Sequence, residues 1–570
     1  GATGTVTFTG NVTLSGLTTA ANAYAVTMNG GTNTITNAVT FLNTGLVTLG
    51  NGAADAFTFN GGVTHTAGST TLFSKINTSA DPVNFAATTI AGNSSILSTG
   101  GNITLAAVNS NVAGSFNFTL TAGAGTIALN GIIGGAAGAT RLATFTASST
   151  PAIAIANNLA ATTVSLTSGG TLTGAGLIDA TTLTTSSVGG TSLSSRNSNG
   201  ATTTYTGTNT TSGALNLTST ATTLILNGVN NSTSTGGINI TDLTGITVNT
   251  ATSVNANTGN LLLTAGTGTL TLSGTAALLS TALVDLTQDL ISISATSQIG
   301  GTAGFAGSAA TVVIDTNTAT TTISIAGGTG SLLLPAASLD RVRATNVRIG
   351  NSASGAINIA SATWTPAANF AATLLTLQSA GTITQTAAIN LGARSLILRS
   401  AGATLATGGN TITNFAASQT GALSISSNSG LVVSNLTDDI GTVAGIAAAA
   451  NNVTLTSTAT ITDGATATIT GGLLTTSSAS GTVLDSANAV TSFNATNSAT
   501  GVITLVNTAA PLTITGISQV GGGSTVTINN TGNISISGSI ATVNPNVTLI
   551  STGSISETGG GAISTTGTLT

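Results

Sequence analysis

Cysteine is absent from this 570-residue sequence, and charged and aromatic side chains are scarce. Lys and Arg together number 8, Asp and Glu number 13, and aromatic residues make up 3% of the chain. The lack of cysteine excludes disulfide bonds and thiolate metal sites. Because nucleic-acid binding needs clustered cations, eight cations in the whole sequence exclude a nucleic-acid partner.

Long apolar runs are missing as well. A membrane-spanning helix needs about 18 or more consecutive apolar residues, and the longest stretches, residues 445–450 and 332–335, are far shorter. Disorder is also excluded. Disordered chains combine low hydrophobicity with high net charge, whereas 41% of these residues are apolar and the net charge is only −5. Too few long polar residues remain for solvent-facing helices. We therefore expect no membrane span and an all-β fold built from strand formers and turn residues.

Aliphatic residues alternate with Thr or Ser in short bursts that are closed by Gly, Asn or Ser. This period of two places aliphatic side chains on one face of a strand and hydroxyls on the other. A phrase of strand, corner and second strand occurs at residues 260–272 and again at residues 374–384. Further copies begin near Ser395, Ala422, Asn452, Gly501, Thr525 and Asn546. The copies recur at roughly 20–30 residues, which is the spacing of solenoid repeats.

The first hundred residues carry a shorter version of the phrase, at residues 6–14 and again at residues 39–49. We therefore predict an N-terminal segment, 1–100, with shorter repeats and a second segment, 101–570, with rungs of roughly 20–30 residues. One rung buries too little aliphatic surface to offset the entropy of ordering it, but stacked rungs share hydrogen bonds and core contacts. With no linker and only 6 prolines, the prediction is one continuous parallel β-helix (β-solenoid) rod.

Three stretches resemble known bacterial exoproteins. Residues 205–217 are similar to the strand repeat of autotransporter passenger domains, and residues 331–359 and 501–516 are similar to filamentous-haemagglutinin-like exoproteins. The resemblance implies a right-handed parallel β-helix, export through an outer-membrane partner, and adhesion or matrix building at the cell surface.

Acidic residues at intervals of about one rung suggest stacked carboxylates. One series is Asp438, Asp439, Asp463 and Asp485, and a second is Asp289, Asp315 and Asp340. Stacked carboxylates would bind Ca²⁺ or, at suitable separations, cleave polysaccharides. The alternative is that Asp replaces Asn at corners, and we favour it. We expect no catalytic residue, no cofactor and only weak Ca²⁺ candidates in the first series.

The basic residues Arg341, Arg343 and Arg348 are the one cationic cluster. It predicts either a patch for an anionic glycan or, as we favour, local pairing or a lateral contact. His65 lies in a strand-like stretch with no Ser or Asp partner in the sequence and is expected at the surface. Ranks of Thr-x-Thr, as at residues 466–470, are a pattern that binds ice when it repeats regularly, but the repeats here are irregular.

The function that these patterns favour is mechanical: a non-catalytic, extracellular fibrous β-solenoid that serves as a surface adhesin or as a filament, sheath or matrix component. Its partners would be surface glycans and proteins or further copies of itself, stacked head to tail. The alternative is a polysaccharide-binding or polysaccharide-cleaving β-helix of the lyase or tailspike type.

Overall fold

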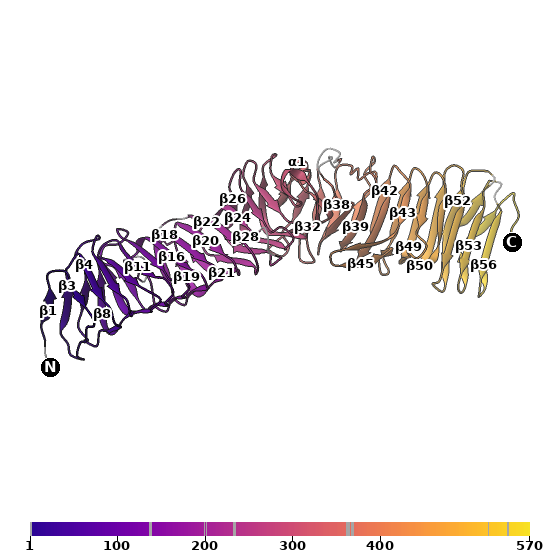
Figure 1. Ribbon diagram of the computed structural model, residues 1–570. Helices are drawn as coiled ribbons and strands as arrows, with labels where there is room; N and C mark the ends of the chain where they lie inside the picture. Colours follow the sequence, from indigo (N-terminus) through magenta and orange to yellow (C-terminus); the bar gives the residue numbers. More distant parts are fainter. Residues whose placement is uncertain are drawn as a thin grey trace. The chain divides into compact units, whose positions relative to one another are not determined.

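Short strands joined by tight corners make up most of the chain in the computed structural model (Figure 1). Strands account for 57% of the residues and helices for 1%. The structure describes residues 3–135, 140–198, 200, 202–231, 235–360, 365, 370–522, 524–543 and 546–570. The chain divides into two compact units, Gly1–Ala282 and Leu283–Thr570. Each unit consists of parallel stacked coils, and together they form about 25 turns of β-solenoid.

Parallel pairing between strands of successive rungs confirms the predicted fold class. In the first unit Val63 lies opposite Val83, and Val83 lies opposite Ile103, which gives rungs of 20 residues. Within each unit, every pairing of described strands is parallel with one exception, the pair β44–β45. The division of the repeats at residue 100 stays a prediction. No described helix is long and apolar enough to cross a membrane.

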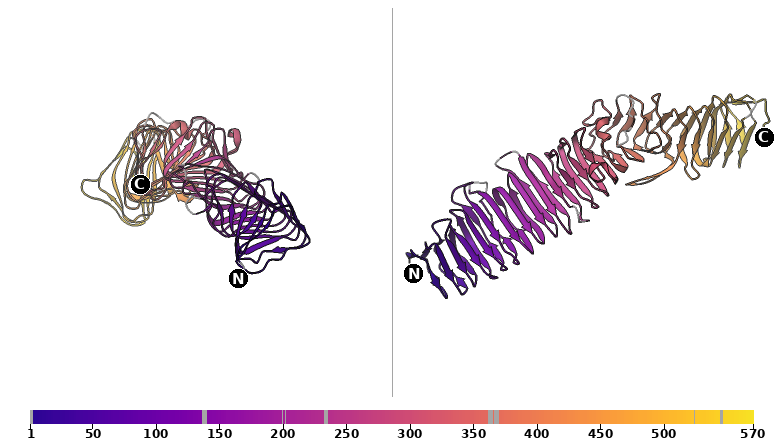
Figure 2. Two further views of the ribbon diagram at one scale, coloured as in Figure 1. Left: turned by 90° about the vertical axis from the view of Figure 1, so that its left-hand side faces the viewer. Right: turned by 45° about the horizontal axis from the view of Figure 1, so that its top comes forward.

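Five consecutive rungs of the first unit, whose strands run side by side in Figure 2, show how alternation builds the core. Their strands are β14 (Asn117–Thr121), β16 (Leu142–Ser149), β18 (Leu159–Ser168), β20 (Thr182–Ser187) and β22 (Thr202–Asn209). One inward position of each strand forms a fully buried column: Phe118, Phe145, Val164, Leu183 and Tyr205. The alternate positions, largely Thr and Ser, face outward and are at least partly exposed.

Corners are held by stacked amides and by glycine. The Asn209 side chain donates to the Asn231 side chain one rung away at 2.9 Å, and Asn507 donates to Asn530 at 2.8 Å. Because these groups are buried, the amide ladders supply the partners that buried polar atoms require. At Gly501 φ is +123°, and an added Cβ would lie 2.2 Å from the Ser480 carbonyl oxygen. Only glycine fits this corner.

One face of the second unit is partly covered by a hairpin that the sequence did not predict. Its strands are β30 (Leu283–Ile293), β32 (Ala309–Asp315), β35 (Ala344–Ile349), β37 (Leu374–Gln378), β39 (Ser395–Ser400) and β41 (Asn414–Gln419). The corners before β35 include the short helices η2 (Ala303–Phe305) and α1 (Ala336–Leu339). The face ends beside a hairpin, β44 (Asn435–Asp438) and β45 (Gly441–Ala444).

The hairpin is an insertion within one rung. It follows β43 (Leu431–Val433) and precedes β46 (Ile446–Ala447), and both of these strands pair with β41. Leu423 lies opposite Val453, so this rung is 30 residues long and the insertion accounts for the excess over a rung of about 20. We call residues 435–444 the strap.

Candidate functional site

The strap covers outward-facing apolar side chains of three consecutive rungs. Leu374, Ile397 and Ala416 lie on β37, β39 and β41 and pack with Val443 of the strap, against which Leu436 also packs. Outward positions of a solenoid strand are ordinarily half-exposed, as the alternating burial of β47 (Val453–Ser457) illustrates. Here Ile397 and Ala416 are completely buried. We call Leu374, Ile397 and Ala416 the apolar strip.

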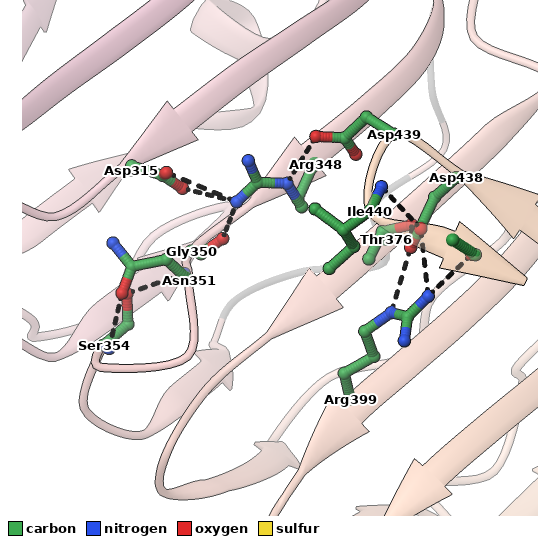
Figure 3. Close-up of polar contacts among 11 residues, drawn as sticks. Asp315, Arg348, Gly350, Asn351, Ser354, Thr376, Arg399, Asp438, Asp439 and Ile440 are labelled. Atoms are coloured by element: carbon green, nitrogen blue, oxygen red, sulfur yellow. Dashed lines mark hydrogen bonds and ion pairs between the residues drawn. The ribbon is translucent and has the colours of Figure 1, made fainter. Parts of the chain in front are cut away.

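Two arginines of the solenoid bind the turn of the strap (Figure 3). Arg399 on β39 donates through Nη2 and Nε to the Asp438 carboxylate at 2.9 and 3.1 Å. The same Nη2 donates to the Gly441 carbonyl at 2.8 Å. The Thr376 hydroxyl donates to Asp438 at 3.1 Å. Asp438 is thus neutralised by a bidentate partner, the strongest geometry for an ion pair.

The second arginine sits between carboxylates from different elements. Arg348 on β35 donates through Nε to Asp439 at 2.9 Å and through Nη1 to Asp315 at 3.0 Å. Nη1 also donates to the Gly350 carbonyl at 2.9 Å. Figure 3 shows the guanidinium between Asp315 on β32 and Asp439 on the strap. The guanidinium therefore ties the strap to the solenoid face.

Three carboxylates lie around the single guanidinium of Arg348. Asp285 on β30 lies near enough to interact electrostatically with both Arg348 and Asp315. Burial raises the pKa of Asp315 to about 7; Arg348 opposes the rise, while Asp285 and Asp439 add to it. Burial also raises the pKa of Asp285, whose buried Oδ1 has no hydrogen-bond partner among the described residues. Of the three carboxylates, only two bond to the arginine.

Each arginine of the predicted basic cluster bonds to other groups of the chain, and the anionic-ligand patch stays a prediction. Arg341 donates to the Ser297 carbonyl at 2.9 Å and stacks over the Phe305 ring at 4.4 Å, and Arg343 donates to the Gly307 carbonyl at 3.3 Å. Arg348 is buried in its ion pairs. Arg348 therefore pairs locally, with Asp315 and Asp439.

The four weak Ca²⁺ candidates do not form one cluster, although Asp463 and Asp485 lie close enough to interact electrostatically. Asp438 and Asp439 lie at the strap turn and pair with arginines. Asp463 on β48 (Ile461–Asp463) accepts from the backbone N–H groups of Asp485 and Ser486 at 3.0 and 3.2 Å. Among the described residues, no three His, Cys, Asp or Glu side chains are grouped so that they could hold a metal ion.

The members of the second acidic series bond to different partners. Asp289 accepts from the N–H groups of Asn317 and Thr318 at 3.0 and 2.8 Å. Asp315 pairs with Arg348, and Asp340 forms the C-cap of α1. Asp289, within β30, and Asp463 each accept hydrogen bonds from the backbone of a neighbouring rung, and the replacement of corner Asn by Asp stays a prediction.

The surface prediction for His65 is wrong, because its side chain is completely buried. It lies on β8 (Val63–Leu72) inside the first unit. Nε2 is 3.2 Å from the Asn43 carbonyl and Nδ1 is 2.9 Å from the Thr70 hydroxyl. Burial lowers the pKa of His65, partly offset by the bond to Asn43. A neutral ring that donates from Nε2 and accepts at Nδ1 satisfies both contacts.

A buried ion cluster in the first unit was not predicted at all. Arg141 and Asp179 form an ion pair, and their side chains are 2% and 1% exposed. Asp179 also accepts from Arg196 Nε at 2.9 Å and from the Ser198 backbone N–H at 3.0 Å. Burial opposes ionisation of Asp179, but the bonds from Ser198 and Arg196 and the charge of Arg141 outweigh it and lower its pKa. No sequence motif marks this cluster, since its members are 17 to 38 residues apart.

A further candidate surface is an array of hydroxyl groups on the first unit. Three outward positions on each of β14, β16, β18, β20 and β22 lie in register from rung to rung. We call them the hydroxyl array: Asn117, Thr119, Thr121, Thr144, Thr146, Ser148, Thr163, Ser165, Thr167, Thr182, Thr184, Ser186, Thr204, Thr206 and Thr208. All but Asn117 are Thr or Ser.

Few hydroxyls of the array are engaged by the protein. Ser148 donates to Thr121 at 3.3 Å, and Thr206 donates to the Asn227 carbonyl at 3.3 Å. The other array hydroxyls make no hydrogen bond within the part of the chain that the structure describes. One edge of the array borders an open depression of about 370 Å³ lined by Thr, Ser and Gly, including Thr121, Ser148 and Thr167. The array thus presents a neutral lattice of hydrogen-bonding groups.

Comparisons with known proteins return no relative. No protein-family model matches the chain, and neither a curated protein nor a solved structure is found to match it. The stacked parallel coils place the chain in the class of β-solenoid proteins, and the evidence for its function is its own geometry.

Proposed function

We propose that this chain is a non-catalytic, extracellular fibrous β-solenoid that works by associating with surfaces, as an adhesin or as a structural filament. The hydroxyl array carries the proposal. Neighbouring rungs are about 4.8 Å apart and successive outward residues about 6.7 Å apart along a strand, so the array offers about 19 by 13 Å of regularly spaced groups. A repetitive, neutral ligand such as a hydroxylated polysaccharide surface would meet many equivalent contacts at once.

The energetics suit many weak contacts rather than one strong site. A single hydrogen bond contributes only about 0.5–1.5 kcal/mol net, but contacts presented on one rigid scaffold add without repeated loss of translational freedom. Most of the array is threonine, whose β-branched side chain has few rotamers to lose on binding. With a net charge of −5 over 570 residues, the chain repels neither a neutral surface nor another copy strongly.

Adsorption to insoluble neutral polysaccharides tests the proposal. The triple substitution Thr146→Lys, Ser165→Lys and Thr184→Lys places three cations on successive rungs of the array. We expect it to weaken adsorption by about tenfold, which corresponds to about 1.4 kcal/mol.

A matched control carries the same three charges elsewhere. Ala128, Ala154 and Thr173 lie in register outside the array, on β15 (Ile127–Leu129), β17 (Ala152–Ile155) and β19 (Thr171–Asp179) of the same unit. Their replacement by Lys should leave adsorption unchanged. Equal losses in the two variants would show that charge alone acts and would overturn the role of the array.

Adhesin and filament are distinguished by particle length. Negative-stain microscopy of purified protein would show discrete particles of one length for an adhesin and continuous fibres for head-to-tail stacking. Polysaccharide cleavage is not favoured, because Asp438 and Asp439 are paired with arginines. Replacing Asp438, Asp439, Asp463 and Asp485 by Asn without effect on glycan degradation would dismiss it.

Ice binding is a second candidate, and the register of the array favours it. Thr-x-Thr, which is irregular in sequence, occurs on four of the five array strands, and the fifth, β18, carries Thr163 and Ser165 in the same register. An ice-recrystallisation assay with the array variant and its matched control tests this candidate. Inhibition that only the array substitutions abolish would support ice binding, and no inhibition by the unmodified chain would reject it.

A further inference from the structure

The strap is attached to the solenoid by side chains, whereas neighbouring rungs are attached to each other by backbone hydrogen bonds. Rungs are joined by backbone ladders, whereas β44 and β45 pair only with each other among the described residues. Beyond its two chain connections, the strap is held by the apolar strip and by the two arginines that bind its turn. It is also held by the Thr376 hydroxyl donating to Asp438 at 3.1 Å and by Asn435 donating to Thr466 at 2.8 Å. An element without ladder bonds opens at a lower free energy than the rungs beneath it.

The charges at the two turn contacts are unequal. Arg399 and Asp438 form a pair of one guanidinium and one carboxylate. Arg348 instead faces Asp315 from β32, Asp439 from the strap and the nearby Asp285 from β30. When all three carboxylates are ionised, Asp439 is attracted by one cation and repelled by two anions. A proton on Asp315 or Asp285 removes part of that repulsion and strengthens the hold on Asp439.

We propose that the strap is a proton-controlled cover: it closes over the apolar strip when the carboxylate cluster around Arg348 holds a proton, and it opens when that proton is lost. The strip of Leu374, Ile397 and Ala416 is the surface that opening exposes. The outward positions in register with the strip on β30, β32 and β35 are mostly polar or charged, such as Asp285, Thr311 and Asn346, with Leu283 and Val313 as the aliphatic exceptions. The inference does not depend on the hydroxyl array.

The direction of the pH dependence follows from the linkage between protonation of Asp315 and closure of the strap. In the closed state burial, Asp285 and Asp439 hold the pKa of Asp315 near 7 against the opposing charge of Arg348. Opening admits water and removes Asp439, so the pKa falls toward its ordinary value near 4. Closure therefore takes up a proton, and the ratio of open to closed strap rises as pH increases toward 7 and levels off above it. From pH 6 to pH 8.5 the open fraction increases up to about tenfold.

A single cysteine beneath the strap measures opening, because the chain contains no other thiol. Ala416→Cys places a thiol on the outward face under the strap, where Ala416 is completely buried. The neighbouring Ala417 is equally buried but faces the core, so Ala417→Cys is the matched control. We expect the labelling rate at position 416, corrected for thiolate content, to rise about tenfold from pH 6 to pH 8.5, and the rate at 417 to stay low.

Substitutions in the carboxylate cluster distinguish proton-dependent opening of the strap from a general weakening of its attachment. Asp315→Asn imitates the protonated carboxyl and should keep position 416 protected at both pH values. Asp438→Asn weakens the Arg399 contact and should raise labelling at both pH values while leaving the pH dependence in place. Should a cysteine variant fold poorly, hydrogen exchange at the Leu436 and Val443 amides of the otherwise unmodified chain gives the same comparison.

Three results would overturn the proposal. One is a corrected labelling rate at position 416 that does not change with pH. Another is equal labelling at positions 416 and 417, which would mean that whole rungs open rather than the strap. The last is an Asp315→Asn variant that keeps the full pH dependence, which would place the controlling proton elsewhere.

Discussion

Removing Asp179 should destabilise the first unit more than any surface substitution. The Asp179 side chain is the carboxylate partner of Arg141, and both side chains are almost completely buried. Even in the intact protein, Nε and Nη1 of Arg141 have no partner in the described part of the chain. Asp179→Ala would leave the guanidinium with only the carbonyl oxygen of residue 179, at 3.2 Å from Nη2. Breaking a buried pair in this way costs about 3–5 kcal/mol.

The assay must report on the rungs around the cluster. Repeat proteins of this length do not always unfold in one step, so native-state hydrogen exchange of the β16 and β18 amides is combined with a urea titration. Asp485→Ala is the control, because its exposed side chain accepts no hydrogen bond from the described residues, and it should cost within about 0.5 kcal/mol.

A rescue variant distinguishes an unpaired charge from lost packing. Adding Arg141→Met to Asp179→Ala removes the stranded guanidinium and should recover most of the loss, since apolar replacements of buried ion pairs are often neutral or stabilising. The reasoning is refuted if Asp179→Ala costs no more than Asp485→Ala, or if Arg141→Met adds to the loss instead of reversing it.

Two further predictions concern the first unit and one corner of the second. Because burial lowers the pKa of His65, the unfolded chain takes up the proton first, and His65 should cost stability as pH falls below about 6.5, by at most about 1.4 kcal/mol per pH unit. Urea midpoints at pH 7.5 and 5 should fall further for the unmodified chain than for His65→Asn, and equal shifts would contradict this. At Gly501, substitution by Val should cost about 1–3 kcal/mol or more, because of its positive φ and the contact with Ser480. A Gly522→Val control, where an added Cβ meets nothing within 4 Å, should cost little.

The alternation of aliphatic and hydroxyl residues predicted the strands and their inward faces, and the long repeat spacing predicted parallel stacking. It predicted the two strands of residues 374–384, found as β37 and β38 (Thr382–Gln385). At residues 260–272 it predicted two strands with a corner, where the structure has one, β28 (Leu261–Leu272). There Gly266, at φ +61°, makes the corner while ladder pairing continues on both sides of it.

Features that depend on the register between rungs were not predictable from local patterns. Thr146 and Ser165 are 19 residues apart, whereas Thr119 and Thr146 on the same face are 27 apart, so no single period aligns the array. Arg348 finds its partners 33 and 91 residues away. The burial of His65 likewise depends on Asn43, which lies 22 residues earlier. Repeated Thr-x-Thr or Thr-x-Ser at 144, 163, 182 and 204 was the one available signal for the array.

Disulfide mapping tests the stacking register most directly, since the chain has no cysteine of its own. Thr146 lies opposite Ser165, one rung away, and Ser165 lies opposite Thr184. A cysteine pair at 146 and 165, about 4.8 Å apart at Cα, should cross-link under mild oxidation, because disulfides span about 4.4–6.8 Å. A pair at 146 and 184, about 9.6 Å apart, should not. Cross-linking of the distant pair, or failure of the near pair in a folded variant, would contradict parallel rungs in this register.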